Sequence, residues 1–321
     1  MEKPILGIHH VTAIASDPQR NLDFYTELLG LRLVKRTVNF DDPGTYHLYF
    51  GDDAGSPGTI LTFFPWPGAA RGSVGVGQVT VTSFSVPEQS LGYWERRLSS
   101  AHVPVERSGK RFDEVVLTFA DPDGLKLEIV GHPGVREPRV PVGSAIPENH
   151  AIRGFYAVTL SEQEFEATAE LLRTMGFRSV AEYGNRFRFD VGEGRAGARV
   201  DVLCVSEARH GRISAGTVHH VAWRVADDES QRAWRQHLLE KHVDITPVID
   251  RCYFHSVYFR EPGGVLFELA TDPPGFAIDE PPEHLGENLK LPSWLETHRK
   301  EIEGVLPALQ LHKAPEVQKR G

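Results

Sequence analysis

Apolar and polar residues alternate along much of this chain, and the alternation is interrupted by stretches with apolar residues three and four positions apart. A period of two predicts half-buried strands, whereas the longer period predicts amphipathic helices. The first group of such segments contains a strand at 7–16, a helix at 21–30, and strands at 31–40, 45–52 and 58–66. The pattern therefore predicts a unit of one strand, one helix and three further strands.

The same order of elements recurs three more times, in units that cover about 78–131, 154–205 and 219–272. The closing segments of the second and fourth units are especially similar. Residues 119–128 read FADPDGLKLE and residues 259–268 read FREPGGVLFE, with Pro and Gly at matching turn positions. Such self-similarity predicts one supersecondary unit used four times.

A stretch rich in Pro and Gly, residues 134–151, separates the second unit from the third and is typical of a linker. We therefore expect an α+β protein with four βαβββ modules in two tandem halves. The N-terminal half covers 1–133 and the C-terminal half covers 152–275.

A Pro-rich tail, residues 276–321, follows the fourth unit. It contains a predicted helix near 293–304, which Ser293 can cap. The tail is expected to pack on the body near the mouth of the site, through apolar side chains at Leu295, Ile302 and Val305.

Composition narrows the class of protein. The 321 residues carry a net charge of −9, and Lys and Arg are scattered, which argues against a nucleic-acid partner. No apolar run is long enough to span a bilayer, and the first residues lack the features of a signal peptide, so we expect a cytoplasmic protein with no membrane contact. Cys204 and Cys252 are too few for a disulfide framework, and Cys252 is expected to be a small buried thiol.

Two His-His-Val triplets begin the first and fourth units, at His9-His10 and His219-His220. Neighbouring residues on a strand point to opposite faces, so each pair can direct only one imidazole into a common site. With the units in register, His10 and His220 are equivalent. The inner units have no histidine there but Gln78 in the second and, depending on the gap chosen, Phe155 or Tyr156 in the third.

The midpoint of each closing strand supplies the third candidate ligand. It is Thr62 in the first unit, Glu128 in the second and Glu268 in the fourth. His10, His220 and Glu268 together form a two-histidine, one-carboxylate set, which suits non-haem Fe(II), with Mn(II) as an alternative. A lone glutamate between apolar neighbours is more often partly exposed, whereas metal coordination would justify burying Glu268.

Several polar side chains precede Glu268 in the segment DRCYFHSVYFR. On a regular strand Tyr258 faces the same way as Ser256 and Phe254, while His255 faces the other way. Tyr258 is therefore the better candidate for the cavity, and Tyr253 is expected to serve packing.

His47 and Tyr49 raise the same question in the first unit, because they share a face and could line the cavity. An alternating Tyr and His strand is equally typical of a half-exposed sheet. His47 is retained as a weaker candidate.

On these residues and the repeated units, the sequence resembles the vicinal oxygen chelate superfamily (glyoxalases, bleomycin resistance proteins and extradiol dioxygenases) over nearly its whole length. It is most similar to the ring-cleaving dioxygenases that act on hydroquinones. The resemblance implies Fe(II) held by two histidines and a glutamate of the outer units, which corresponds to His10, His220 and Glu268. Catechol-cleaving relatives instead take their ligands from the third and fourth units, and the third unit here lacks the histidine.

The resemblance also implies that catalytic groups surround the metal, at His9, His219, Arg251 and Tyr258. We interpret His219 and Tyr258 as acid–base partners and Arg251 as a stabiliser of negative charge, and which one moves the proton stays open. His9 is equally well explained as a structural histidine.

The resulting hypothesis is a dioxygenase that opens a para-diphenol ring and inserts both atoms of O₂, with a small aromatic molecule and O₂ as its partners. A homo-oligomer is compatible with the sequence. One alternative is a glyoxalase-like, metal-dependent lyase or isomerase, although such sites usually contain a second carboxylate. Another is a non-catalytic protein that sequesters an aromatic compound or a drug.

Overall fold

The computed structural model of the chain describes residues 3–108, 111–112, 114–141 and 143–311. Parts of three predicted segments lie outside the described residues: 109–110 and 113 in the second unit, 142 in the linker and 312–321 in the tail.

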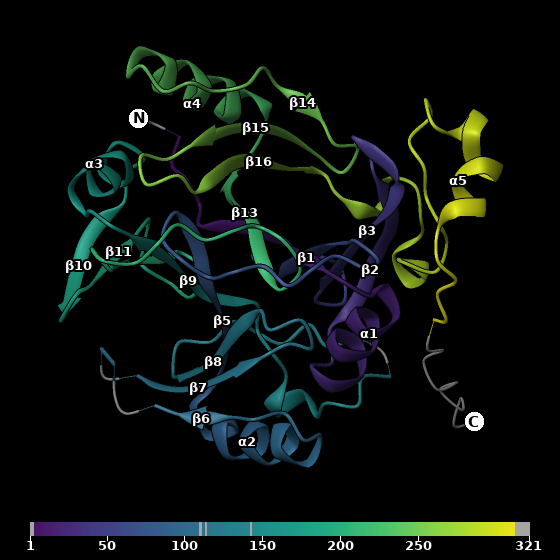
Figure 1. The fold of residues 1–321 in the computed structure, drawn as a ribbon, viewed down its shortest axis with the longest axis horizontal. Coiled ribbons are helices and arrows are strands. Elements are labelled where there is room, and N and C mark those ends of the chain that lie inside the picture. The colour runs from purple at the N-terminus through teal and green to yellow at the C-terminus, as the bar shows by residue number, and fades with distance from the viewer. Residues whose placement is uncertain (1–2, 109–110, 113, 142, 312–321) are drawn as a thin grey trace.

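The four predicted units are confirmed, each with a strand, a helix and three more strands (Figure 1). The first unit contains β1 (Ile8–Ala15), α1 (Pro18–Asp23), β2 (Arg32–Asn39), β3 (Asp42–Gly51) and β4 (Ile60–Pro65), with a π-helical segment, Phe24–Leu28, after α1. The second contains β5 (Gln78–Pro87), α2 (Leu91–Ser100), β6 (Glu106–Arg107), β7 (Val115–Ala120) and β8 (Lys126–His132). The third contains β9 (Phe155–Glu162), α3 (Glu166–Thr174), β10 (Arg178–Tyr183), β11 (Arg186–Asp190) and β12 (Arg199–Cys204). The fourth contains β13 (Thr217–Val225), α4 (Asp228–Glu240), β14 (Ile249–Asp250), β15 (Phe254–Arg260) and β16 (Leu266–Pro274).

The strands form two eight-stranded sheets, and each sheet joins units that are not in the same half of the sequence. The outer units make the sheet β14-β15-β16-β13-β1-β4-β3-β2, and the inner units make the sheet β10-β11-β12-β9-β5-β8-β7-β6. In each sheet the first strands of two units pair antiparallel at the centre, as β1 does with β13 and β5 with β9. The outer sheet therefore brings the two ends of the repeat region together, while the half boundaries at 133 and 152 stay predictions.

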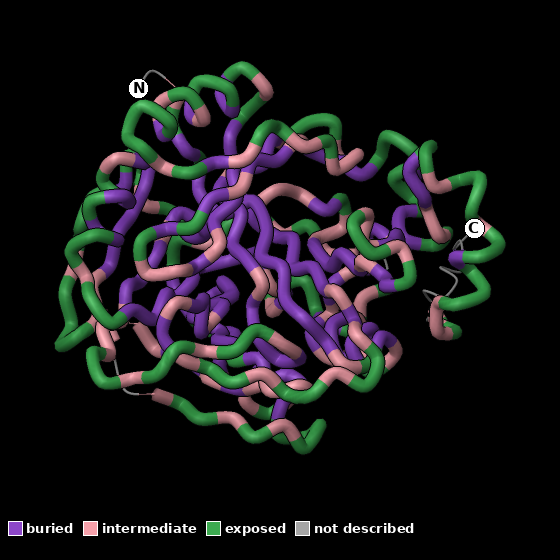
Figure 2. The backbone as a smooth tube through the Cα atoms, turned by 45° about the horizontal axis from the view of Figure 1, so that its top comes forward, coloured by how far each residue is buried: buried purple, intermediate pink, exposed green. Residues whose placement is uncertain are grey.

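Burial explains why these segments are strands. All eight residues of β1 are buried, because it lies at the centre of the outer sheet, and the buried backbone gathers in the middle of the molecule (Figure 2). The helices lie at the periphery, where each buries one apolar stripe, such as Trp234 and Leu238 of α4. Asp227 caps α4 by accepting a hydrogen bond from the backbone N–H of Ser230. Among the described residues, no helix is both long and apolar enough to cross a bilayer.

The tail helix differs from its prediction. It begins as a 3₁₀ turn at Glu296–His298 and continues as α5 (Arg299–Val305), so Ser293 is not its cap. Ile302 is buried against Val38 and Leu291, as an apolar stripe requires, and Leu295 is partly buried in the same cluster. Val305 is 66% exposed, which corrects its assignment to the packed face.

A buried lysine ties the tail to the outer sheet. Lys35 of β2 has no exposed surface, and its Nζ lies 2.6 Å from Asp279 Oδ1 and 2.5 Å from Glu280 Oε2. The ammonium group also lies 5.0 Å from the ring centre of Tyr253, whose hydroxyl donates to Asp279. Tyr253 is thus a packing residue, as predicted, and the tail is held against the edge strand beside the site.

One buried carboxyl lies between the two sheets without a hydrogen-bond partner. Glu162, the last residue of β9, is 1% exposed, and neither of its carboxyl oxygens has a partner among the described residues. Its side chain packs against Gly263, in the turn between β15 and β16. Burial, with a smaller contribution from Glu261, raises the pKa of Glu162 to about 8.

This pKa predicts a pH dependence of folding stability. Between the ordinary carboxyl pKa and about 8, Glu162 is protonated in the folded chain and ionised in the unfolded chain. The free energy of unfolding should therefore fall as pH rises through this window, by at most about 1.4 kcal/mol per pH unit from this group. Glu162→Gln should remove that decline in denaturant titrations at a series of pH values. Glu166→Gln, an exposed site on α3, is the control, and equal slopes for wild type and Glu162→Gln would contradict the account.

Candidate metal centre

Three predicted ligands from opposite ends of the chain meet inside the outer sheet. His10 Nε2 lies 3.2 Å from His220 Nε2 and 3.2 Å from Glu268 Oε2, and His220 Nε2 lies 2.9 Å from the same oxygen. The side chains of His10, His220 and Glu268 are 2%, 6% and 0% exposed. Among the described residues they form the one group of three or more His, Cys, Asp or Glu side chains arranged to hold a metal ion.

The strand register explains this convergence. On the antiparallel pair β1–β13, His10 lies opposite Ala222 and Thr12 lies opposite His220. The two histidines are therefore diagonal neighbours on one face of the sheet, within reach of each other. On the parallel pair β13–β16, Ala222 lies opposite Glu268, which places the carboxylate beside both imidazoles.

The donor set fits a divalent cation. Glu268 Oε2 is buried and accepts no hydrogen bond from the described residues, although two imidazole nitrogens lie within 3.2 Å of it. A buried carboxylate oxygen left in this way is costly unless a cation satisfies it. Two imidazoles and one carboxylate on one side of an ion leave its other positions open to exogenous ligands.

The first histidine of each pair contacts the second. His9 Nδ1 lies 3.0 Å from His10 Nδ1, and His219 Nδ1 lies 2.8 Å from His220 Nδ1. Such a contact at Nδ1 fixes the ring and leaves Nε2 free for the centre. Phe254 packs against both His9 and His10, with ring centres 5.2 and 4.9 Å away.

Three side chains from β15 and the segment before it surround Glu268. Ser256 Oγ donates to Glu268 Oε1 at 2.5 Å. Tyr258 lies opposite Glu268 on the paired strand, with its ring 5.8 Å from the ring of His220. Arg251 Nε donates to the Tyr258 hydroxyl at 3.3 Å, and its guanidinium also pairs with Asp41. The structure thus brings together all seven predicted site residues.

Burial and mutual contacts set the protonation of these groups. Burial, followed by the neighbouring His220, lowers the pKa of His219 to about 3. Burial, followed by His10, lowers the pKa of His9 well below its usual value. Burial alone would raise the pKa of Glu268, but His10 and His220 outweigh it and hold that pKa well below its ordinary range. An ionised carboxylate and neutral imidazoles are the forms that bind a metal.

The first unit mirrors the fourth across the β1–β13 pair. Thr62 of β4 lies opposite Thr12, two residues after His10, just as Glu268 lies opposite Ala222, two residues after His220. Tyr49 faces Thr62 on the next strand, as Tyr258 faces Glu268. The position of a second carboxylate is therefore occupied by a threonine.

The strands of the inner sheet are arranged in the same way, but its described residues contain no group of side chains placed to hold a metal ion. Glu128 lies opposite Ser83, so the residue that corresponds to His220 in the second unit is Val81. In the third unit Asp201 lies opposite Thr159, which assigns that position to Ala157. The predicted equivalents, Gln78 and Phe155 or Tyr156, are therefore wrong, because strand pairing assigns these positions to residues that sequence similarity alone did not align with His220.

Arginines engage the carboxylates of the inner sheet. Arg111 donates two hydrogen bonds to Glu128, at 2.9 and 2.8 Å, and Ser83 donates a third at 2.7 Å. Arg188 and Arg186 donate to Asp201. Because their oxygens accept hydrogen bonds from arginines, these carboxylates serve as ion-pair partners.

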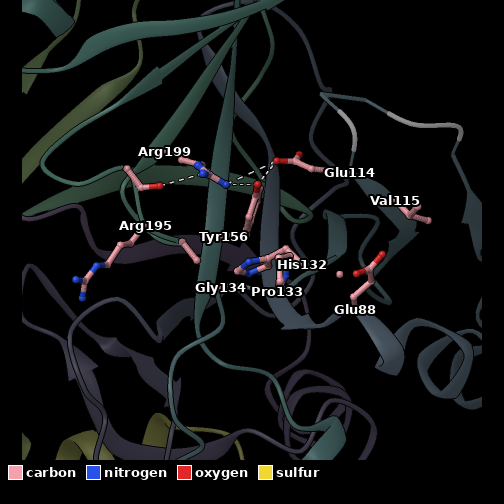
Figure 3. A pocket seen from close by; sticks show the side chains of 12 residues that line it. Glu88, Glu114, Val115, His132, Pro133, Gly134, Tyr156, Arg195 and Arg199 are labelled. Carbon is pink, nitrogen blue, oxygen red and sulfur yellow. Dashed lines mark hydrogen bonds and ion pairs between the residues drawn. The ribbon is translucent and has the colours of Figure 1, made fainter.

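A cavity of about 510 Å³ opens beside these ion pairs, and its wall includes Glu114, His132, Tyr156 and Arg199 (Figure 3). Arg199 and Glu114 converge on the Tyr156 hydroxyl in this view. No predicted site residue lines this cavity, so the metal centre and the hollow of the inner sheet are separate features.

Sequence reasoning missed Ser256, Thr12 and Phe254 as parts of the site. The signal for Ser256 and Phe254 was present, because both share a strand face with Tyr258. Thr12 gave no such signal, since its contact with Thr62 depends on strand pairing. His255 points away from the centre, as predicted, with Nδ1 2.6 Å from Asp228 Oδ1. Cys252 and Cys204 are free thiols of intermediate exposure, so the expectation of a buried Cys252 is wrong.

Comparison with known proteins supports the family resemblance inferred from the sequence. The sequence profile of the Glyoxalase/Bleomycin resistance protein/Dioxygenase superfamily matches residues 7–129 and 192–269. The chain belongs to this superfamily. MhqO of Bacillus subtilis (strain 168), named provisionally as a ring-cleaving dioxygenase, is 49% identical over 309 residues, which cover 96% of this chain and 98% of that protein. The chlorohydroquinone/hydroquinone 1,2-dioxygenase of Sphingobium indicum is 34% identical and covers 92% of this chain and 94% of that enzyme.

Solved structures of the superfamily agree with this fold. A crystal structure from Bacillus subtilis, provisionally described as a dioxygenase, has a TM-score of 0.92 and 47% identity, covering 97% of this chain and 99% of that one. Glyoxalase I from Zea mays has a TM-score of 0.61 at 14% identity, covering 83% of this chain and 92% of that one, which shows the shared fold. Relatives that match almost the full length of this chain are named as dioxygenases. The chain is accordingly a dioxygenase of this superfamily.

Ser256→Ala should weaken metal binding. The substitution removes the hydrogen bond that orients Glu268, and loss of such a support typically lowers metal affinity about 10–100-fold. Ser83→Ala is a matched control, because it removes a similar Ser–Glu hydrogen bond from the inner sheet. Competition with a chromophoric chelator measures both affinities, and an unchanged affinity for Ser256→Ala would contradict this role.

Proposed function

We propose that this protein is an Fe(II)-dependent, ring-cleaving dioxygenase that acts on a hydroquinone-type para-diphenol and inserts both atoms of O₂. Mn(II) is the alternative metal. The observation that carries the proposal is the buried convergence of His10 Nε2, His220 Nε2 and Glu268 Oε2, with a threonine where a fourth protein ligand would stand. The name of the Sphingobium indicum relative supports the substrate class.

In this proposal the residues around the centre bind, orient and protonate. A bound Fe(II) ion would supply the electron transfer between an aromatic substrate and O₂. His10, His220 and Glu268 would hold that ion on one side, and Ser256 keeps Glu268 in its orientation. His9 acts on the centre through its contact with His10.

In this proposal His219 and Tyr258 are the residues that donate protons. If His219 Nδ1 accepts from the Nδ1–H of His220, its proton lies on Nε2, from which it can be donated. Burial raises the pKa of Tyr258, so its hydroxyl stays protonated and can donate. Arg251 beside that hydroxyl would stabilise negative charge that develops on the substrate.

Thr62 also separates this proposal from a glyoxalase-like isomerase. A metal site that acts only as a Lewis acid in such enzymes usually includes a second carboxylate, and here the mirrored position offers a hydroxyl instead. A non-catalytic binding role has no comparable support. The proposal further includes a cytoplasmic location for the protein.

The test is O₂ uptake after anaerobic reconstitution with Fe(II), or separately Mn(II). Addition of hydroquinone or methylhydroquinone should consume one O₂ per molecule of substrate, and catechol should be poor. His10→Ala and His220→Ala should lose both bound metal and O₂ uptake. His255→Gln, which alters a histidine that faces away from the centre, should retain both.

Two results would contradict the proposal. One is no uptake with any hydroquinone by protein that contains one iron per chain. The other is turnover of a substrate without O₂, which would favour the isomerase. Normal iron binding by His10→Ala would overturn the ligand assignment itself.

A further inference from the structure

A chain of hydrogen bonds occupies the side of the centre that has no carboxylate. Thr62 Oγ1 lies 2.9 Å from Thr12 Oγ1 and 2.8 Å from His47 Nε2, and His47 Nδ1 lies 2.8 Å from the Tyr49 hydroxyl. These contacts join β1, β4 and β3 and approach the metal centre from the first unit. His47, a weaker candidate from sequence, therefore belongs to an ordered group of side chains.

The burial of Tyr49 determines which group donates and which accepts in the hydrogen bonds among Tyr49, His47 and Thr62. Its side chain is 1% exposed, and His47 Nδ1 is the one hydrogen-bond partner of its hydroxyl among the described residues. If the hydroxyl accepted from His47, its own hydrogen would have no acceptor, which costs roughly 1–3 kcal/mol. Tyr49 therefore donates to Nδ1, the imidazole proton lies on Nε2, and His47 donates to Thr62.

A neutral His47 agrees with this arrangement. Burial, followed by the neighbouring His10 and His220, lowers the pKa of His47 well below its usual value. Burial likewise raises the pKa of Tyr49, so the phenol keeps its proton. Tyr49 then donates one hydrogen bond to His47, and His47 donates one to Thr62.

The hydrogen bond between Thr12 and Thr62 decides whether Thr62 has a free donor. If Thr12 donates, the Thr62 oxygen accepts from both His47 and Thr12, and its own hydroxyl hydrogen is left for a further partner. The side chain of the mirrored Glu268 is two carbon atoms longer than that of threonine. At the corresponding position Thr62 therefore offers a shorter side chain that ends in a hydroxyl, where Glu268 offers a carboxylate oxygen.

We propose that Thr62 donates a hydrogen bond to a phenolic oxygen of the substrate on the side of the centre opposite Glu268. His47 and Tyr49 are positioning residues that hold the Thr62 hydroxyl in the donating orientation. Because successive donors polarise one another, this unit favours an ionised phenolate over a neutral phenol. The inference rests on the proposed function, since it requires a phenolic ligand at the metal.

Binding of 4-nitrophenol under argon to the Fe(II)-loaded protein tests the inference without turnover, because the anion of this phenol absorbs visible light. Wild type should bind it as the anion at a pH where the free compound is largely neutral. Thr62→Val and Tyr49→Phe should raise the dissociation constant about tenfold and raise the pH at which the bound phenol ionises by about one unit. Thr62→Ser, which keeps the hydroxyl, should resemble wild type.

Tyr46→Phe is the matched control, because Tyr46 lies on the same strand but donates to the Pro307 carbonyl. Iron content should stay at the wild-type level in all variants. Wild-type affinity and ionisation in both Thr62→Val and Tyr49→Phe would overturn the inference. If Thr62→Val loses iron, the inference is tested by comparing the affinity and ionisation of bound 4-nitrophenol in Tyr49→Phe with those in Tyr46→Phe.

The two proposals can fail separately. Absence of O₂ uptake with hydroquinones contradicts the dioxygenase proposal even when 4-nitrophenol binds as described. Normal O₂ uptake together with unaltered phenol binding in the variants contradicts only the role of Thr62.

Discussion

The antiparallel pairing of β1 with β13 is the constraint on which the metal centre depends. It joins segments from opposite ends of the repeat region, and its two-residue offset sets His10 and His220 diagonally on one face of the sheet. A shift of the register by one residue would turn either imidazole to the other face. The neighbouring parallel strand then adds Glu268, and the surrounding side chains serve mainly to orient these three.

The two sheets share one arrangement of strands but carry different side chains at the corresponding positions. In the outer sheet, histidines and one carboxylate face a common point, and the mirrored carboxylate position is a threonine. In the inner sheet, the histidine positions are Val81 and Ala157, and the carboxylates Glu128 and Asp201 are bound by arginines. Buried carboxylates need a cation in either case. The chain supplies its own cations to the inner sheet, and the outer sheet has the donor set for a metal.

Much of this arrangement could be predicted from the sequence, because repetition makes the evidence redundant. Four strand–helix–strand units, the facing of Tyr258, the outward direction of His255 and the equivalence of His10 with His220 all follow from periodicity. What failed depended on strand pairing and on local backbone geometry. Pairing with the closing strands assigns the equivalents of His220 to Val81 and Ala157, and a 3₁₀ turn delays the tail helix past Ser293. The contacts among Thr12, Thr62 and His47 could not be foreseen, because they join three strands whose pairing no single segment encodes.

The most direct test of the central claim is a crystal structure of the Fe(II)-loaded protein with anomalous diffraction measured at the iron edge. One strong anomalous peak should lie about 2 Å from His10 Nε2, His220 Nε2 and Glu268 Oε2, with no fourth protein atom as a ligand. Iron located elsewhere, or bound by a further side chain that closes the open positions, would contradict the account.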